Sequence, residues 1–577
     1  MNDCPNLACA TPAAAFIPYP GDHGHNDYFG LIRELVARRQ AAQSGERQNR
    51  QDEIERIYSL IMDELQNNPG PPRSPVSFGT SGWRGILGKD IFARSVRQVT
   101  LAIVNVYREA DQERELAAAL GVVDLAEAKK RGIVVGHDNR FGGEMLAKQV
   151  CEVLTGHGFL VHYAGEATTG SLSAATLVLA AAGSINLTPS HNPLEYGGFK
   201  YNAADAGPAA ALITNRITSH AKRIIGENQP VTLNADPALI RPLDALAAWQ
   251  QLVRSNRAAH GLDYDAIIAA LADRDDLVIA IDCVHGSARV HLDRLLAGIP
   301  PERLLRFRAD NDPTFGGVAP EPSTANMATI VAALKQRPEP LKLGAIIDPD
   351  GDRIRFTDGE TEIDMNHFGA IAYHYLHESK GKRGMVAKTV ATSNFANAIA
   401  AALGEEVFEP RVGFKEFKPV IGKALVLFEE SDGISLIGHT PEKDAYIGLL
   451  LALDLMISKN RNLGAYYQEI SARYGHFFPG RGGVTVSRQG AALQQTLAGL
   501  ERYAPGAVLM VGGTPRKIKE VITIDGRKMI LEDGGWLMIR PSGTEPKVRF
   551  YVEARTASDQ DALLTTAENL LKEINLL

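Results

Sequence analysis

From Val76 onward, short apolar runs alternate with longer stretches of helical pattern, and each run ends in a polar loop. Three such runs lie at 132–135, 277–281 and 385–387. The succession of strand, polar loop and helix is typical of α/β domains. Its recurrence in three consecutive blocks indicates related units, although no exact sequence repeat joins them. Because open α/β sheets place their chemistry at strand ends, the loops after these runs are the first candidates for a site.

One such loop is Thr188–Pro193, which reads TPSHNP and follows the apolar run 184–187. An apolar run that stops at a proline-flanked polar loop predicts a strand ending in a rigid turn, which would display Ser190 and leave it unburied. A serine hydroxyl needs a nearby base or charge to act as a nucleophile, and His191 and Lys200 are close in sequence. The alternative is a turn in which the prolines fix φ and Ser and Asn cap the backbone.

A second loop, DPDGDR, carries three carboxylates at alternate positions, Asp348, Asp350 and Asp352. They offer hard oxygen ligands suited to Mg²⁺, with positions left for water and a phosphate oxygen. A calcium EF-hand fails on spacing, because its sixth position would be Arg353 where that motif needs glycine. The alternative to a metal site is a solvated acidic turn, since Asp, Pro and Gly are also turn formers.

A third loop, RPSGTEPK, lies near the C-terminus between the apolar run 536–539 and the alternating stretch 548–554. Arg540 can pair with a phosphate through two hydrogen bonds, and the hydroxyls of Ser542 and Thr544 and the loop N–H groups can fill its other lone pairs. A Pro/Gly hairpin turn between two strands is the alternative.

Two further loops are weak evidence by themselves. The early stretch 78–85 reads FGTSGWRG and brings glycines, hydroxyls and Arg84 together, which suits an anion. The stretch 428–433 reads FEESDG after an apolar run, and its carboxylates could accept hydrogen bonds from sugar hydroxyls.

Taken together and in this order, the five loops resemble the α-D-phosphohexomutase superfamily, the phosphoglucomutase and phosphomannomutase enzymes, from about Val76 to the C-terminus. TPSHNP followed by GGFKYN is most similar to the phosphoglucomutase branch. The resemblance implies an α/β fold with three consecutive α/β domains plus a smaller α+β C-terminal domain around a central cleft, preceded by a helical N-terminal extension. The expected parts are an extension at 1–75, α/β domains at 76–230, 231–360 and 361–475, and the C-terminal domain at 476–577.

The resemblance also implies roles for individual residues. Ser190 would be the phosphoserine, and Asp348, Asp350 and Asp352 would hold one Mg²⁺ per chain against it. His191, Lys200 and Lys415 are candidates for proton transfer, with a structural loop histidine as the alternative for His191. Arg84 would help to neutralise phosphate at the metal site. The residues expected to bind the substrate are Arg353, Glu429, Ser431, Arg540, Ser542, Gly543 and Thr544.

The implied reaction interconverts glucose 1-phosphate and glucose 6-phosphate through phosphoserine and a glucose 1,6-bisphosphate intermediate, which would also be the activator. Phosphoryl transfer depends on positioning and on positive charge, which Mg²⁺, Arg and Lys supply. Water must be excluded while phosphoserine waits, so we expect the C-terminal domain to close over the cleft, with a hinge in the Gly/Pro-rich stretch 478–483.

The sugar loop departs from the family pattern, because Phe428 stands where a glycine is usual and Asp432 adds a charge. Phosphomannomutase, phosphopentomutase and glucose 1,6-bisphosphate synthase therefore remain alternatives, and the FEE string and the C-terminal loop resemble the branch with the last two activities. A non-catalytic phosphosugar sensor is the alternative from another class. The retained serine and aspartates disfavour it.

Composition and motif searches narrow the class further. A chain of 577 residues is long enough for three to five domains, and 61 basic against 68 acidic residues give a net charge of −7, which argues against a nucleic-acid partner. The sequence has no GxxxxGK[ST], GxGxxG, HExxH or GxSxG motif. We expect a small phosphosugar as the partner of a monomer or small homo-oligomer.

The cysteines and the N-terminal stretch predict a cytoplasmic protein without a membrane segment. The four cysteines, Cys4, Cys9, Cys151 and Cys283, show no metal spacing, and such sparse use suits a reducing compartment. The first basic residue is Arg33, so a charged signal-peptide start is missing, and no apolar run reaches the roughly 18 residues of a membrane span.

The stretch before the family motifs is predicted to be irregular to about residue 27 and then to form helices at 28–40 and 51–67. In the second helix, an apolar stripe recurs at intervals of three and four residues. Its members are Ile54, Ile57, Ile61 and Leu65. A packed amphipathic helix is the common case, so we expect this stripe to pack on the body of the protein instead of serving a partner.

Overall fold

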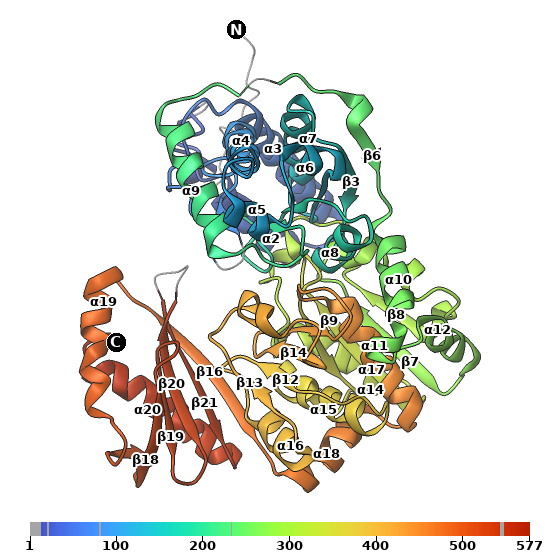
Figure 1. The fold of residues 1–577 in the computed structure, drawn as a ribbon, viewed down its shortest axis with the longest axis vertical. Coiled ribbons are helices and arrows are strands. Elements are labelled where there is room, and N and C mark those ends of the chain that lie inside the picture. Colours follow the sequence, from blue (N-terminus) through green and yellow to red (C-terminus); the bar gives the residue numbers. More distant parts are fainter. Residues whose placement is uncertain (1–12, 20–21, 80–81, 232, 543–546) are drawn as a thin grey trace. The chain divides into compact units, whose positions relative to one another are not determined.

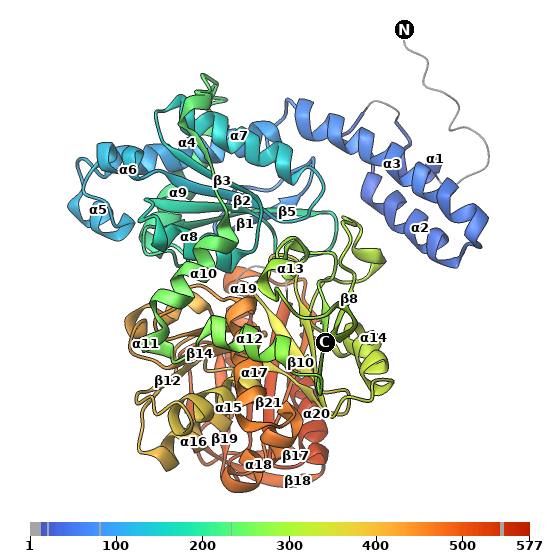
Figure 2. The ribbon, with the colours of Figure 1, turned by 90° about the vertical axis from the view of Figure 1, so that its right-hand side faces the viewer.

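The structure is a computed structural model that describes residues 13–19, 22–79, 82–231, 233–542 and 547–577. Figures 1 and 2 draw the helices and strands, and the chain forms two compact units. Unit 1 contains 1–252, 280–326 and 346–352, and unit 2 contains 253–279, 327–345 and 353–577. Within the described part of the chain, no helix combines the length and the apolar character needed to cross a membrane.

The N-terminal extension is a helical hairpin. Its helices are α1 (Ala13–Phe16), α2 (Tyr28–Ala41) and α3 (Ser44–Asn67). The side chains of Ile54, Ile57, Ile61 and Leu65 are buried in the core of the first α/β domain, which confirms the predicted stripe. Helix α2 packs along α3 (Figure 2). Helix α3 begins earlier than predicted. Its first turns are polar, so the sequence shows no apolar stripe there that would have predicted a helix.

The first α/β domain has a six-stranded sheet of order β1-β5-β4-β2-β3-β6. Its strands are β1 (Trp83–Ile86), β2 (Ile133–His137), β3 (Val161–Glu166), β4 (Gly183–Leu187), β5 (Tyr196–Ala203) and β6 (Ile240–Pro242). Its helices are α4 (Ala93–Glu109), α5 (Arg114–Leu120), α6 (Leu125–Arg131), α7 (Gly143–Gly156), α8 (Thr169–Val178), α9 (Ala211–Gly226) and η1 (Pro237–Leu239).

The two central strands of this sheet, β2 and β4, are parallel and buried along their whole length. A strand covered by helices on both faces needs apolar or small residues throughout, which is why continuous apolar runs predicted it. Helices α4 and α7 cover one face of the sheet and α8 covers the other (Figure 2). The strands therefore end at a shared edge, where the loops after β2 and β4 lie.

The next block forms a five-stranded sheet of order β11-β10-β9-β7-β8, which contains residues of both units. Its strands are β7 (Leu277–Asp282), β8 (Leu304–Phe307), β9 (Leu341–Ile347), β10 (Ile354–Thr357) and β11 (Glu362–Ile363). Its helices are α10 (Ala245–Ser255), α11 (Arg257–His260), α12 (Tyr264–Asp273), η2 (Ser287–Val290), α13 (Leu292–Leu295), η3 (Pro301–Arg303), η4 (Phe315–Gly317) and α14 (Thr324–Lys335).

The third α/β block has a four-stranded sheet of order β13-β12-β14-β15. Its strands are β12 (Val386–Lys388), β13 (Val407–Phe408), β14 (Val426–Glu429) and β15 (Gly433–Leu436). Its helices are α15 (Met365–Glu378), α16 (Phe395–Leu403), η5 (Phe414–Val420), α17 (Ala445–Lys459) and α18 (Leu463–Tyr474).

The C-terminal domain is an antiparallel sheet of order β16-β21-β20-β19-β18-β17, with α20 packed on one face (Figure 1). Its strands are β16 (Phe478–Thr485), β17 (Val508–Val511), β18 (Thr514–Ile522), β19 (Arg527–Leu531), β20 (Trp536–Pro541) and β21 (Lys547–Ala554). Its helices are α19 (Gly490–Leu497), η6 (Ala498–Arg502) and α20 (Ala557–Glu573).

The stretch 478–483 forms part of β16, and the whole strand pairs with β21 from Phe478 opposite Ala554 to Thr485 opposite Lys547. A hinge within these residues is therefore wrong, since bending there would break the ladder of the sheet. Glycines in an edge strand give the same sequence signal as glycines in a loop.

A buried charged cluster joins the third block to the C-terminal domain within unit 2. Lys388 and Lys528 both bond to Glu409, at 2.9 and 3.2 Å. Lys528 also donates to the carbonyl of Val390 at 2.8 Å, and its ammonium lies 4.1 Å from the ring centroid of Trp536. Side chains on β20 alternate between the two faces of the sheet, so Trp536 packs with Val390 while Leu537 faces the core beside α20.

Candidate active site

Ser190 lies in the loop after β4, as predicted, but its side chain is buried and only 1% exposed. The expectation that a strand-end serine would be displayed is wrong, because the loop 348–352 folds over it from 158 residues away in the chain. The backbone of Ser190 has a φ of 59°, which non-glycine residues adopt at a cost. Its N–H donates to Thr188 Oγ1 at 2.8 Å, which helps to hold this conformation.

The Ser190 hydroxyl contacts two groups that can accept or exchange its proton. Its Oγ donates to Asp348 Oδ2 at 2.9 Å and lies 3.3 Å from His191 Nδ1. This brings the predicted nucleophile, its neighbouring histidine and the first predicted metal ligand together in unit 1.

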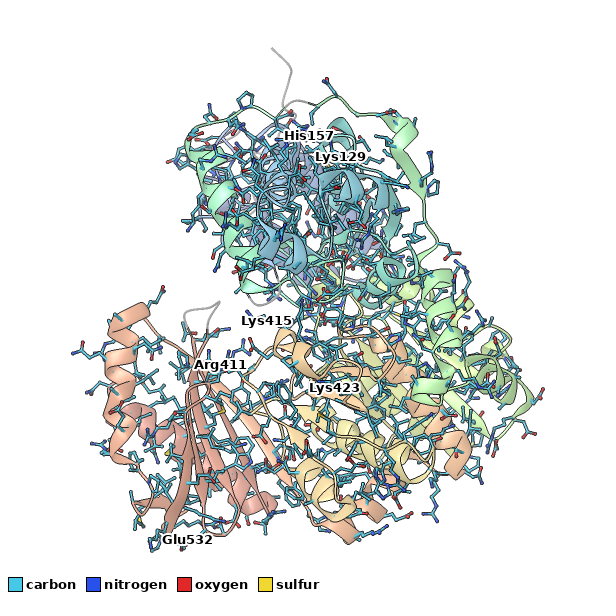
Figure 3. All side chains as sticks on the ribbon, in the orientation of Figure 1. Lys129, His157, Arg411, Lys415, Lys423 and Glu532 are labelled. Carbon is cyan, nitrogen blue, oxygen red and sulfur yellow. The ribbon has the colours of Figure 1, made fainter. Side chains whose placement is uncertain are left out.

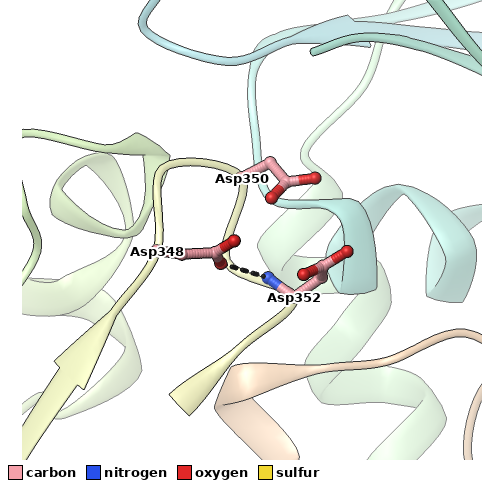
Figure 4. Close-up of side chains that lie close together, drawn as sticks. All are labelled: Asp348, Asp350 and Asp352. Atoms are coloured by element: carbon pink, nitrogen blue, oxygen red, sulfur yellow. Dashed lines mark hydrogen bonds between the residues drawn. The ribbon is translucent and has the colours of Figure 1, made fainter. Parts of the chain in front are cut away.

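The three aspartates of the second loop converge (Figure 4). Asp348, Asp350 and Asp352 are buried, and each offers a carboxylate oxygen within 4.8 Å of the others. The loop turns because Gly351 has a φ of 65° and lies so close to Thr168 that a Cβ would come within 2.5 Å of its Cγ2. The Asp352 N–H donates to Asp348 Oδ1 at 3.0 Å, which fixes one ligand against another.

Lys200 brings a positive charge to this group. Its ammonium donates to Asp350 Oδ2 at 2.5 Å and to Asp352 Oδ2 at 3.0 Å. Thr169, which begins α8, donates its hydroxyl to Asp350 Oδ2 at 2.8 Å. Among the described residues, Asp350 Oδ1 is buried without a hydrogen-bond partner. A buried unpaired carboxylate oxygen is costly, so this donor set fits a hard cation such as Mg²⁺.

Arg84 reaches the serine loop from β1. Its Nη1 donates to Asn192 Oδ1 at 2.8 Å, and β1 pairs antiparallel with β5, the strand that carries Lys200. The predicted anion-binding arginine thus lies beside the serine loop, also within unit 1.

The predicted sugar-binding residues lie in unit 2. Glu429 ends β14 and accepts from the Gly413 N–H at 3.0 Å, while the Ser431 hydroxyl donates to Glu429 Oε2 at 3.4 Å. Lys415 lies two residues after Gly413, in η5 (Figure 3). Arg353 forms an isolated β-bridge with Gly433, just after Ser431. Four of the predicted residues therefore belong to one local cluster of loops.

The predicted phosphate loop is described only in part. Arg540 lies at the end of β20 and its Nε donates to Asp525 Oδ2 at 2.7 Å, while the Ser542 N–H donates to the carbonyl of Lys547 at 2.8 Å. Gly543 and Thr544 lie outside the described residues. Asp525 also accepts from the Val412 N–H at 3.0 Å, so it orients Arg540 next to the loop that leads to Lys415.

The two departures from the family pattern point away from the sugar loop's hydrogen-bonding groups. Phe428 is fully buried with its ring against Gly369 of α15. Asp432 accepts from Arg355 Nη2 at 2.7 Å and Nε at 3.3 Å. Burial opposes a charge on Arg355, but Asp432 outweighs it and raises the pKa of the guanidinium. Phe428 and Asp432 thus both make their contacts inside the local core.

Sequence reasoning missed three residues of this region, namely Thr169, Arg140 and Asp525. Arg140 had a signal, because the polar residues 138–140 directly follow β2 at the same sheet edge as the serine loop. Its Nη2 donates to the carbonyl of Ser190 at 2.8 Å. Thr169 and Asp525 had none, since each acts through contacts with residues distant in the chain.

The chain matches four domain families in order. They are described as phosphoglucomutase/phosphomannomutase α/β/α domain I at residues 75–227, domain II at 249–361, domain III at 364–474 and the C-terminal domain at 494–569. The order confirms the predicted class of three α/β domains followed by a C-terminal domain.

Relatives and solved structures agree with these matches. The chain is 24% identical over 504 residues to a phosphoglucomutase/phosphomannomutase of Thermococcus kodakarensis, covering 86% of this chain and 98% of that one. It is 25% identical over 570 residues to a phosphoglucomutase of Komagataeibacter xylinus, covering 91% and 96%. The open form of parafusin, a phosphoglucomutase from Paramecium, has a similar fold with a TM-score of 0.68 at 20% identity, over 88% of this chain and 96% of that one.

Proposed function

Because the chain belongs to the phosphoglucomutase/phosphomannomutase family of phosphohexomutases, which are isomerases, we propose that it interconverts glucose 1-phosphate and glucose 6-phosphate through a phosphoserine at Ser190. The observation that carries the proposal is the 2.9 Å contact between Ser190 Oγ and Asp348 Oδ2, within a group of three buried carboxylates. A serine so placed is held where a phosphoryl group on it would meet a metal site.

Asp348, Asp350, Asp352 and Ser190 are the residues that would hold one Mg²⁺. When bound, the ion supplies positive charge against phosphoryl oxygens. Lys200 supplies charge from the protein itself, since its ammonium already bonds to two of the carboxylates. An ammonium has no lone pair to take a proton but can give one, so we assign to Lys200 charge compensation and keep it as a candidate for proton transfer.

In the proposed reaction, a sugar hydroxyl forms a bond to phosphorus while the bond from phosphorus to Ser190 Oγ breaks. The glucose 1,6-bisphosphate that results then returns its other phosphoryl group to Ser190. His191 Nδ1, 3.3 Å from Ser190 Oγ, is placed to exchange a proton with the serine. Lys415 remains our candidate for proton transfer with the sugar, and Arg540 for holding the phosphate that does not react.

Glucose phosphate is preferred over other sugars on one ground. Phe428 and Asp432, the residues that depart from phosphoglucomutase loops, are turned into the core, so they leave Glu429 and Ser431, our candidates for binding the sugar hydroxyls, next to each other. Mannose phosphate, pentose phosphate and bisphosphate synthesis remain the alternatives that the experiment must separate.

The test is ³¹P NMR of the protein with Mg²⁺ and glucose 1-phosphate, primed with trace glucose 1,6-bisphosphate, beside tubes of mannose 1-phosphate and ribose 1-phosphate. We expect rapid appearance of glucose 6-phosphate. Faster conversion of another sugar would change the substrate, and accumulation of bisphosphate after addition of a phosphoryl donor would indicate the synthase. No phosphoryl transfer in any tube would contradict the proposal.

Ser190→Ala should abolish turnover and phosphorylation of the protein while leaving its thermal unfolding nearly unchanged, because the variant loses the nucleophile and little packing. Ser173→Ala is the matched control, since Ser173 is a fully buried serine of the same domain whose hydroxyl bonds to the carbonyl of Ala206 at 2.6 Å. Undiminished turnover of Ser190→Ala would exclude Ser190 as the nucleophile.

A further inference from the structure

Arg140, in the loop after β2, gathers the carbonyl groups of the serine loop. Its guanidinium donates to the carbonyl of Ser190 at 2.8 Å and also to the carbonyls of Asn192 and Pro193. The side chain is only 5% exposed. One planar donor group thus serves three backbone carbonyls, of which that of Pro193 also accepts from the Tyr196 N–H at 3.0 Å. Serving several acceptors at once suits the fixed fork of arginine.

The same loop is held from its N–H side. Thr188 Oγ1 accepts from the Ser190 N–H and donates to Asp138 Oδ2 at 2.6 Å. Burial lowers the pKa of Arg140 to about 10, partly offset by Asp138, so the guanidinium remains charged at neutral pH. The unfavourable φ of Ser190 is therefore fixed between Asp138 and Arg140.

A phenylalanine from a distant loop covers one face of the Arg140 guanidinium. The guanidinium carbon lies 4.6 Å from the ring centroid of Phe315, which is fully buried and begins η4. Phe141, the neighbour of Arg140, stacks on Tyr58 of α3 at 4.2 Å between ring centroids. Arg140 and its neighbour thus both meet aromatic rings, one of them from the N-terminal hairpin.

Helix α2 holds the Phe315 loop through one of its faces. Arg39 donates to Asp312 Oδ2 at 3.1 Å and Gln40 bonds to the carbonyl of Gly316. Gly317 has a φ of 77°, and a Cβ there would come within 2.7 Å of Val36 Cγ1, so only glycine allows this approach.

Arg33 lies on the same face of α2, at helical spacing from Val36 and Gln40. It pairs with Glu195 at 2.9 Å, two residues after the serine loop. Helix α2 therefore contacts both the exit of the serine loop and the loop that covers Arg140.

We propose that Arg140 is a positioning residue for Ser190, and that the N-terminal hairpin braces it through Phe315. This inference rests on the proposed function of Ser190. It gives the extension a role in catalysis without contact with the substrate. Loss of the brace should lower kcat, because the serine would leave its reactive position. It should leave KM nearly unchanged, because Glu429, Ser431 and Arg540, which we expect to bind the sugar and its unreactive phosphate, lie in unit 2.

The experiment compares Arg140→Ala, Arg140→Lys and Phe315→Leu in the full chain. We expect Arg140→Ala to lower kcat about 100-fold, the cost of a misplacement near 1 Å, and guanidinium ion to restore part of it. Arg140→Lys should remain impaired, because a point charge cannot serve three carbonyls. Phe315→Leu should lower kcat by up to about 30-fold through loss of the cation–π contact.

Arg131→Ala is the matched control, because Arg131 also donates to three backbone carbonyls, those of Gly121, Ala180 and Ala181, away from the serine loop. It should lose stability with kcat unchanged. Hydrogen exchange of the peptide that contains 188–193 gives a readout independent of turnover. It should rise in Arg140→Ala and Phe315→Leu, and stay at the wild-type level in Arg131→Ala.

Two failures can be told apart. If the wild-type protein neither converts substrate nor becomes phosphorylated, the proposed function is wrong. Hydrogen exchange of the 188–193 peptide then still tests the brace. If the wild-type protein is active and both Arg140→Lys and Phe315→Leu keep its kcat and its exchange pattern, the positioning role is overturned. Phe315→Leu decides the case if the Arg140 variants do not fold.

Discussion

The Asp138 side chain is fully buried. Among the described residues its nearest cationic group is Arg140, whose Nε lies 3.8 Å from Asp138 Oδ2. Burial raises its pKa to about 7, against the opposing charge of Arg140 and the hydrogen bond from Thr188. Between pH 4 and 7 the folded state therefore binds more protons at this residue than the unfolded state. Its contribution to stability falls as pH rises through that window.

Asp138→Asn should remove this pH dependence. We expect the free energy of unfolding of the wild-type protein to lose up to about 4 kcal/mol more than that of the variant between pH 4 and 8, from a shift of about three pKa units. Urea titrations at several pH values would measure it, with the surface variant Asp265→Asn as control. Parallel stability profiles for wild type and Asp138→Asn would contradict the raised pKa.

Residues whose function depends on their immediate neighbours in the chain were predictable from the sequence. The spacing of Asp348, Asp350 and Asp352 already indicated a metal group, because a turn of this composition must bring the three carboxylates together. The burial of Ser190 was not predictable, since it depends on a loop 158 residues away. The role of Asp525 was not predicted either, because nothing near it in the chain identifies Arg540 as its partner.

Among the elements, β12 and β19 are joined by a cluster of buried charges. Lys388 ends β12, Lys528 lies on β19, and Glu409, which directly follows β13, bonds to both. Burial opposes a charge on Glu409, but Lys388 and Lys528 outweigh it and lower its pKa to about 2. A carboxylate with a lowered pKa contributes stability that is present above the unfolded value near 4.5 and is lost as pH falls towards 2. The cluster therefore stabilises the contact of the two domains at neutral pH.

Glu409→Gln should destabilise unit 2 by about 3–5 kcal/mol at pH 7, because it leaves two buried lysines without their counter-charge. Denaturant unfolding followed by Trp536 fluorescence would report it, since Lys528 lies over that ring. The control is Glu532→Gln, an exposed glutamate of the same domain (Figure 3). An equal effect of the two substitutions would show that the cluster contributes nothing measurable.

Elements with a regular pattern were predicted well. The runs at 132–135, 277–281 and 385–387 became β2, β7 and β12, because continuous apolar stretches are typical of strands buried on both faces. The hinge at 478–483 was wrong because strand pairing is decided by a partner, here β21, that the local sequence does not contain. The same holds for the first turns of α3, which are helical without an apolar stripe.

The whole molecule divides its proposed tasks between two units. Ser190 and the three aspartates belong to unit 1, while Glu429 and Arg540 belong to unit 2. Family resemblance predicted four domains in order, but it could not predict this division, because the boundary passes within strands β7 and β9.

Variants in the two units should therefore separate metal affinity from substrate affinity. Arg540→Ala should raise KM for glucose 1-phosphate about 10- to 150-fold by loss of charged hydrogen bonds to phosphate, with the thermal shift caused by Mg²⁺ unchanged. Asp348→Asn should abolish that thermal shift. Steady-state kinetics and thermal unfolding with and without Mg²⁺ would measure both, and a changed metal response in Arg540→Ala would contradict the division.

The path of the chain between the units has a consequence for how the protein is made. Unit 1 has all of its residues once Asp352 has left the ribosome, whereas unit 2 needs the last strands and α20. The segment 253–279 is synthesised early, and its helix α12 must wait for α17 (Ala445–Lys459), on which it packs. During translation, buried residues of α12 such as Leu271 therefore stay exposed until α17 has been made, and chaperones would find a target there.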